Sequence, residues 1–490
     1  MANMDRRSFV LAALGGLGGA ALSGCDDVPR IFGPQTGLLA DVDAAGIHIR
    51  QNIYCLGDTH PDLVAYRNAI TTMKTWPATF PTSWMAQANI HGTSSPPPGM
   101  LANLCQHGNF FFLSWHRMYL YYFERIIRCV SGQPNFALPF WGYTPSGTRN
   151  LPKPFRVPAD PSNVLYESSR DPSVNAGNPL SAGIVDPGVA LAQIAFNSFS
   201  SLLEGTPHGA VHVAVGGLMG FVNTAAQDPI FWLHHAQIDR LWNVWLAMGG
   251  GRANPTDPTW LNTSWEFYDE FGHIVKLTGA QVVDTAMQLC YRYGSVPCLT
   301  VATPETLAYQ PDGSTMMVLD PIRSRPVLPD PIPVGVQGPV TLASNPVQVT
   351  IPVSADGQKA LQAFANDSNG GNALIVQLDD ISLQQPARIY YEVYADLPSG
   401  TTDTAYTSPY FVGNLDFFGI GQQMTGMAMP ASRRLSLTRV YAYLRSRNLW
   451  SDKEVRLTFV PRGNTEDQVP AQRLGGAAQA TIGKVTLRIE

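Results

Sequence analysis

The sequence predicts a multidomain chain in which a mainly α-helical domain is followed by an all-β sandwich domain. Three observations support this prediction. Residues from about 37 to 300 are rich in aromatic and helical segments and contain all ten histidines. Prolines then crowd into the interval 301–346. Short β-branched and aromatic runs separated by turn residues follow that interval.

On this pattern the chain divides into four parts: a targeting segment (1–25), a chemical domain (26–300), a proline-rich linker (301–346) and a β-domain (347–490). Proline and the residue before it disfavour helix, so we expect extended chain in the linker. The β-domain is expected to contain strands at 347–351, 373–378, 388–394, 455–460 and 484–489. It contains no histidine, so the chemistry is expected before residue 300.

The first 25 residues resemble an export signal. Arg6-Arg7-Ser8-Phe9-Val10 is typical of a twin-arginine signal, and the apolar stretch that follows is too short to span a membrane. Leu22-Ser23-Gly24-Cys25 is similar to a bacterial lipobox, in which Cys25 would be lipidated and would anchor the protein; the alternative is an ordinary signal with an incidental cysteine. Both interpretations predict the periplasm or cell envelope of a bacterium.

The charge of the chain argues against nucleic acid as a partner. The net charge is −5 and no run is dense in lysine or arginine, so the footprint of a nucleic-acid binder is absent. A small neutral substrate suits this balance better. The sequence does not indicate an oligomeric state.

Seven of the ten histidines lie in two short windows. In the later window, His208 and His212 are spaced i, i+4, so both project from one face of a helix and can chelate one ion. Asp228-Pro229 is typical of a helix start and precedes His234 and His235. Adjacent helical residues point about 100° apart. One of these two histidines should therefore complete a three-histidine site, and periodicity does not decide which.

The earlier window contains His91, His107 and His116. Residues 112–124 form a strong helical pattern that includes His116. His107 would lie on the opposite face of a continuous helix, so we expect it to precede the helix, at the turn formed by Gly108-Asn109. His91 is expected in a loop or at a helix end.

The ligand type favours copper. Hydrolytic two-metal sites generally use carboxylates, whereas three neutral imidazoles per ion suit copper through a Cu(I)/Cu(II) cycle. Zinc could occupy one three-histidine site. Two such sites with no acidic residue at the motif positions favour two copper ions and redox chemistry.

These residues resemble the type-3 copper family of tyrosinases, polyphenol oxidases and haemocyanins. His107 with Phe112-Leu113-Ser114-Trp115-His116-Arg117, and Asp228-Pro229-Ile230-Phe231-Trp232 with His235 and Asp239, are similar to its two copper signatures. The resemblance implies a four-helix bundle holding a binuclear centre. It also implies His91, His107 and His116 as ligands of one copper, and His208, His212 and His235 as ligands of the other, which leaves His234 as a neighbour.

The same resemblance implies an oxidation of o-diphenols, and of monophenols to a smaller extent, to o-quinones with O2. Glu204 matches a glutamate that holds a water near the metals. Gly209 replaces an asparagine typical of strong monophenolases, whereas Val222 matches a gate residue and leaves more room for monophenols. The C-terminal segments 390–394 and 409–413 resemble the domain that shields latent plant enzymes. The alternatives are an o-aminophenol-type oxidase and a haemocyanin-like oxygen carrier.

The cysteines divide by expected role. Cys105-Gln106-His107 is similar to the Cys-x-His thioether of fungal tyrosinases, in which the sulfur bonds to the histidine. With Cys25 and Cys105 so used, four cysteines remain that an exported protein can pair: Cys55, Cys129, Cys290 and Cys298. Cys290 and Cys298 are nearest in sequence, but spacing does not assign a bridge.

Overall fold

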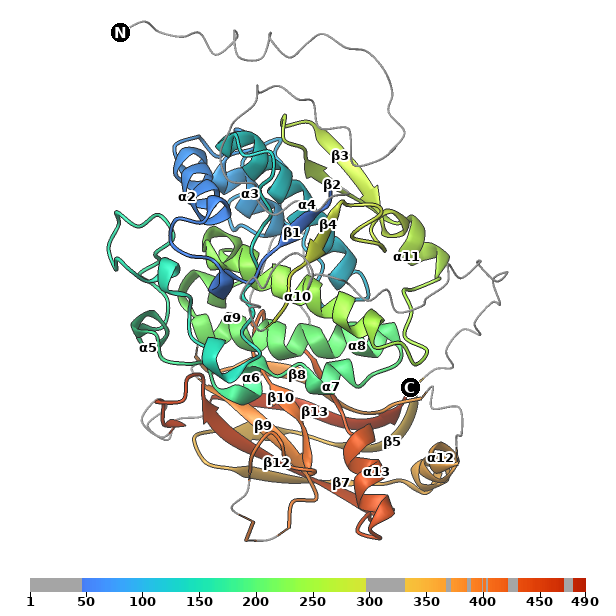
Figure 1. Ribbon diagram of the computed structural model, residues 1–490. Helices are drawn as coiled ribbons and strands as arrows, with labels where there is room; N and C mark the ends of the chain where they lie inside the picture. Colours follow the sequence, from blue (N-terminus) through green and yellow to red (C-terminus); the bar gives the residue numbers. More distant parts are fainter. Residues whose placement is uncertain are drawn as a thin grey trace, which may run out of the picture.

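The computed structural model describes residues 46–296, 331–366, 372–385, 389–398, 400–401, 404–421, 431–470 and 479–490. A helical domain stacks on a two-sheet domain, with α6 to α9 next to the sheets (Figure 1). The predicted export signal, Cys25 and Cys298 lie outside the described residues. Among the described helices, none is both long and apolar enough to cross a bilayer.

The helical domain is built around α2 (Pro61–Lys74), α3 (Trp84–His91), α4 (Phe112–Ser131), α8 (Phe196–Leu203), α9 (Ala210–Val215) and α10 (Ile230–Ala247), of which α2, α4 and α10 are long. Short helices complete it: α5 (Pro172–Ala176), α6 (Ala182–Val185), α7 (Gly188–Leu191) and α11 (Pro258–Asn262). Helix α4 begins where the sequence predicts and ends at Ser131, followed by Gly132, whose positive φ suits a helix cap.

Helix α10 begins one residue later than the sequence predicts. The Asp228 carboxylate nonetheless accepts the Ile230 N–H (3.1 Å) and so caps the first turn, as expected of a residue at a helix start. Arg170 holds the same carboxylate through two hydrogen bonds of 2.8 and 2.6 Å, with both side chains fully buried. The direction of the helix that carries His235 is therefore fixed at its first turn.

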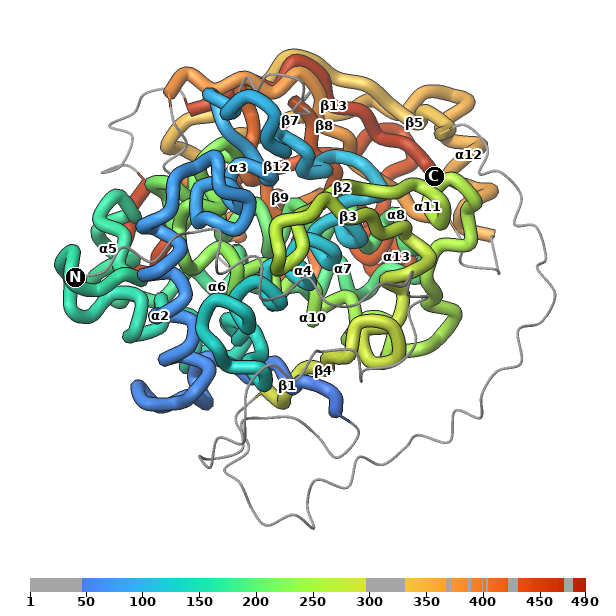
Figure 2. Tube along the Cα trace, turned by 90° about the horizontal axis from the view of Figure 1, so that it is seen from above, coloured from blue at the N-terminus to red at the C-terminus, as the bar shows by residue number. Residues whose placement is uncertain are grey.

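Strands close the helical domain. β1 (His48–Arg50) pairs in parallel with β4 (Tyr291–Tyr293), which brings the two ends of the domain side by side (Figure 2). β2 (Ser264–Tyr268) and β3 (Ile274–Thr278) form a separate hairpin. Cys55 and Cys290, near these ends, each take part in a disulfide. Cys129 is an exposed free thiol, so the four cysteines that remained available for pairing are not all paired.

The C-terminal domain consists of two antiparallel sheets that share one core. One sheet has the order β10-β9-β12-β7 and the other β11-β8-β13-β5, with β6 beside β13. The strands are β5 (Ile332–Gln337), β6 (Val340–Leu342), β7 (Val347–Pro352), β8 (Leu374–Leu383), β9 (Ile389–Ala395), β10 (Phe411–Leu415), β11 (Arg433–Ser436), β12 (Glu454–Gly463) and β13 (Ala480–Ile489). Each of the five predicted strands overlaps one of these.

Two predictions about this domain need correction. The interval 301–346 is too long as a linker, because β5 and β6 lie inside it and pair with β13. Pro333 is compatible with β5 because this strand is at the edge of its sheet. The domain is also not all-β, since it includes α12 (Ala355–Ala365) and α13 (Thr438–Ser446), each with a narrow buried face.

Buried charges connect the helices behind the histidines. The Glu124 carboxylate of α4 accepts hydrogen bonds from Arg50 Nε (2.7 Å), from Arg128 and from the Leu138 N–H (2.9 Å). Burial alone would raise the pKa of Glu124, but Arg50 and Arg128 outweigh it and bring that pKa to about 2. The carboxylate therefore stays charged in the folded protein through most of the acid range.

Glu124→Gln is expected to lower the free energy of unfolding by about 3–5 kcal/mol at pH 7, because it leaves buried arginines unpaired. A carboxyl pKa depressed from about 4.3 when unfolded contributes stability that is complete above that value and is lost as the pH falls toward about 2. The loss caused by Glu124→Gln should therefore be smaller at pH 3 than at pH 7 in urea titrations.

Glu266→Gln provides the control, because Glu266 pairs with Lys276 on the surface, with side chains 42% and 60% exposed. Its effect should stay within about 1 kcal/mol at both pH values. A Glu124→Gln effect of equal size at pH 7 and pH 3 would contradict the account.

Candidate metal centre

Two clusters of histidines lie next to each other inside the helical domain. In each cluster, the potential ligand atoms lie within 4.8 Å of one another: His91, His107 and His116 in the first; His208, His212, His234 and His235 in the second. The clusters touch, because the rings of His116 and His235 stack with centroids 4.5 Å apart. The structure thus brings all six predicted ligands together in two adjoining groups.

Local structure places the histidines as the sequence predicts, with one addition. His91 is the last residue of α3, and His107 precedes α4 at a turn in which Gly108 adopts a φ of 67°. His208 lies in η4 (Glu204–Gly209), where the chain kinks at Thr206, whose φ of −133° and ψ of 122° are not helical, and His212 follows in α9. The sequence predicts the i, i+4 relation of the two histidines but not this kink.

The Nδ1 atoms of most of these histidines are held by backbone carbonyls at 2.8–2.9 Å: His91 by Val222, His116 by Phe112, His208 by Glu204 and His212 by Met219. His107 Nδ1 lies 3.2 Å from Glu204 Oε1 instead. A carbonyl only accepts, so Nδ1 has the hydrogen and Nε2 keeps its lone pair. This arrangement orients imidazoles as metal ligands.

The spacing of the Nε2 atoms fits metal ions. His91 Nε2 lies 3.4 Å from His107 Nε2, and His212 Nε2 lies 3.2 Å from His235 Nε2. Two lone pairs at this separation repel unless a cation lies between them. An ion about 2.0–2.1 Å from each nitrogen, the usual zinc–imidazole length, would span such a gap. The neutral nitrogen donors, with no carboxylate among them, suit copper.

Burial keeps these imidazoles neutral and ready to bind a metal. It is the main cause that holds the pKa well below the ordinary histidine value at five positions: His91, His116, His208, His212 and His235. The neighbouring histidines lower these pKa values further. These five imidazoles are thus deprotonated, as metal binding requires, across the ordinary pH range.

His234 has different surroundings from His235. Its Nδ1 lies 3.2 Å from the Tyr143 hydroxyl, and burial lowers its pKa to about 3. The His235 ring contacts both His91 and His116 of the first cluster. The ring contacts of His234 within the described chain are with Tyr143 and members of its own cluster. His235 therefore lies between the two clusters and His234 lies behind them.

The remaining predicted site residues lie close by. Glu204 Oε1 accepts the Gly108 N–H (2.7 Å) besides facing His107. Cys105 is a buried thiol whose pKa is raised by burial and by Glu204. Val222 is fully buried in the core, and its carbonyl rather than its side chain reaches His91, so its role as a gate stays a prediction. Gly209 follows His208 and faces the β-domain.

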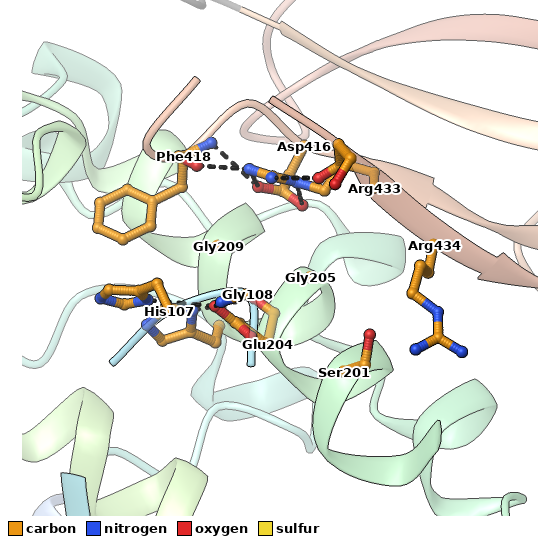
Figure 3. Close-up of a pocket in the computed structure, with 12 residues that line it drawn as sticks. His107, Gly108, Ser201, Glu204, Gly205, Gly209, Asp416, Phe418, Arg433 and Arg434 are labelled. Atoms are coloured by element: carbon orange, nitrogen blue, oxygen red, sulfur yellow. Dashed lines mark hydrogen bonds and ion pairs between the residues drawn. The ribbon is translucent and has the colours of Figure 1, made fainter. Parts of the chain in front are cut away.

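The β-domain inserts a side chain into the centre, which the sequence analysis missed. The Phe418 ring, from the loop after β10, stacks on the His212 ring with centroids 4.1 Å apart and planes 14° apart. It also contacts the His107 ring (Figure 3). A third contact is with the His208 ring. The cavity that remains between the domains is about 80 Å³. Neither hydrophobic periodicity nor a sequence motif identifies Phe418, because its role depends only on how the two domains pack against each other.

Comparisons with known proteins agree with this geometry. Residues 81–180 and 175–248 match the common central domain of tyrosinase, 254–303 the polyphenol oxidase middle domain, and 334–488 a domain of unknown function. A tyrosinase of Hahella sp. (strain CCB-MM4) is 28% identical over 90% of this chain and 99% of its own length. A chloroplastic polyphenol oxidase of Vicia faba is 31% identical, but the match covers only 48% of this chain and 46% of the relative.

The fold is similar to that of latent apple tyrosinase, with a TM-score of 0.61 at 21% identity over 92% of this chain and 100% of that chain. Two adjoining histidine clusters on a helical core define a binuclear metal protein. The chain belongs to the type-3 copper family of tyrosinases and polyphenol oxidases, and its cofactor is a pair of copper ions.

His235→Ala is expected to reduce bound copper from two ions to about one per chain, because it removes a nitrogen from a three-histidine site. His234→Ala opens a hole of the same size in the same helix and should retain both ions. Copper per chain, measured by mass spectrometry of the metal after dialysis, checks this. Loss of copper from His234→Ala with retention in His235→Ala would reverse the assignment.

Proposed function

We propose that this protein oxidises o-diphenols, and monophenols more slowly, to o-quinones with O2. The observation that supports this most directly is the set of inward-facing Nε2 atoms, each cluster suited to one copper ion. His91, His107 and His116 would hold one ion, and His208, His212 and His235 the other. When bound, the copper pair supplies the redox chemistry that couples O2 reduction to phenol oxidation. The copper pair would be held by a four-helix bundle that consists of α3, α4, α9 and α10.

Proton transfer would fall to Glu204. A phenol has a pKa near 10 and enters protonated, so its oxidation needs a base nearby. Glu204 lies at the edge of the residual cavity, where its second oxygen can hold a water near the incoming hydroxyl.

A Cys105–His107 thioether would fix the orientation of the His107 ring. It would also make the peptide that contains both residues lighter by two hydrogens in mass spectrometry.

Substrate preference would depend on Gly209, which supplies no amide to help deprotonate a monophenol. Diphenols, which lose their protons and electrons more readily, would be the better substrates. The ratio of monophenol to diphenol turnover measures this preference.

The intact chain would be latent. Substrate pockets are usually about 300–1,000 Å³, far larger than the cavity of about 80 Å³ left beneath Phe418. The Phe418 ring occupies the face of His212 on which a phenol ring would stack. Displacement of the β-domain, for example after cleavage between residues 301 and 330, would therefore precede full activity.

For its location, we propose the periplasm or cell envelope of a bacterium, after twin-arginine export. The sequence motif Arg6-Arg7 supports export, and Cys25 supports a lipid anchor. Fractionation of cells that express the full chain, with and without Cys25→Ala, would locate the protein.

Phe418→Ala is expected to raise o-diphenol turnover by the copper-loaded intact chain by about tenfold, because an aromatic pair contributes roughly 0.5–1.5 kcal/mol and 1.4 kcal/mol corresponds to a factor of ten. Oxygen uptake with an o-diphenol and with its monophenol, at matched copper content, provides the measurement. No oxidation by either protein, even after removal of the β-domain, would refute the proposed activity. Equal rates for the two intact proteins would refute only latency.

A further inference from the structure

Gly209 occupies a position where the backbone does not require glycine. Its φ and ψ are −62° and −37°, an ordinary right-handed helical conformation. Alanine is favoured over glycine inside a helix, so a glycine here reduces the stability of this turn. Some other constraint must therefore exclude a side chain at this position.

That constraint comes from the other domain. A Cβ atom built on Gly209 would lie 2.4 Å from Asp416 Oδ1 and 3.0 Å from Asp416 Cγ. The first distance is shorter than real Cβ contacts allow. Figure 3 shows Asp416 of the β-domain above Gly209, beside Phe418.

Asp416 is held too firmly to move aside. Its carboxylate is almost fully buried and accepts hydrogen bonds from Arg433 Nε and Nη2, both at 3.0 Å. Its Oδ1 also accepts the Phe418 N–H at 3.0 Å. Arg433 in turn donates to the Phe418 carbonyl. The carboxylate that rests against Gly209 is thus the group that positions the backbone of Phe418.

We propose that Gly209 is the docking socket of an autoinhibitory contact: it lacks a side chain so that Asp416 can approach and seat Phe418 on His212. The effect on activity rests on the proposed phenol oxidation, whereas the docking does not. Gly209 then controls how tightly the β-domain closes the copper site, besides any influence on substrate choice. A side chain at this position would separate the domains locally and lift Phe418.

The test compares Gly209→Ala with Gly205→Ala in the full chain. A Cβ on Gly205 would lie 3.5 Å from Asp416 Oδ2, an ordinary contact, so this variant is a matched control four residues earlier. Amide hydrogen exchange of the segment 411–421, followed by mass spectrometry, should be roughly tenfold faster in Gly209→Ala, because local opening controls exchange. It should be unchanged in Gly205→Ala. Normal protection in Gly209→Ala would overturn the proposal.

A second pair of variants separates docking from simple damage to the helix. Asp416→Ala alone should speed exchange, since Phe418 loses its anchor. Adding Gly209→Ala to Asp416→Ala should cause little further change, because the colliding carboxylate is gone. If Gly209→Ala has its full effect in both backgrounds, the cause lies within the helix and the socket is refuted. Exchange reports on docking even if no variant oxidises a phenol.

Discussion

The copper site depends on the Asp239 carboxylate, which joins three separate parts of the chain. Asp239 Oδ1 accepts a hydrogen bond from Arg117 of α4, and Oδ2 accepts from the Tyr291 and Tyr293 hydroxyls of β4 at 2.5 and 2.6 Å. These contacts hold α4 against α10, which carry His116 and His235. A relative shift of the two helices would separate the two stacked imidazoles, one from each cluster.

Much of the site can be predicted from the sequence, because its ligands lie in local patterns. The i, i+4 spacing of His208 and His212, the turn before α4 and the helix start at Asp228 each depend on neighbouring residues. The choice of His235 over His234 as a copper ligand required the family resemblance. The contact between His234 Nδ1 and the Tyr143 hydroxyl now gives a physical reason for that choice. Local patterns do not show which residues meet across domains, so Phe418, Asp416 and Arg433 were missed.

The errors in the fold prediction have similar causes. Prolines in 301–346 indicated a linker, but Pro333 lies in an edge strand. Such a strand tolerates proline because the backbone on its outer side makes no hydrogen bonds to another strand. Helices α12 and α13 were missed because they bury only a narrow face, and strand patterns dominate the sequence around them. Gly209 was interpreted through substrate chemistry alone. The structure adds that any side chain there would collide with Asp416.

The central claim is that two copper ions lie side by side, one in each histidine cluster, beneath Phe418. X-ray diffraction from crystals of the copper-loaded full chain, measured at the copper absorption edge, tests it most directly. Two anomalous peaks are expected, one among the Nε2 atoms of His91, His107 and His116 and one among those of His208, His212 and His235, with Phe418 over the second. A single peak, or a metal bound by His234 in place of His235, would contradict it.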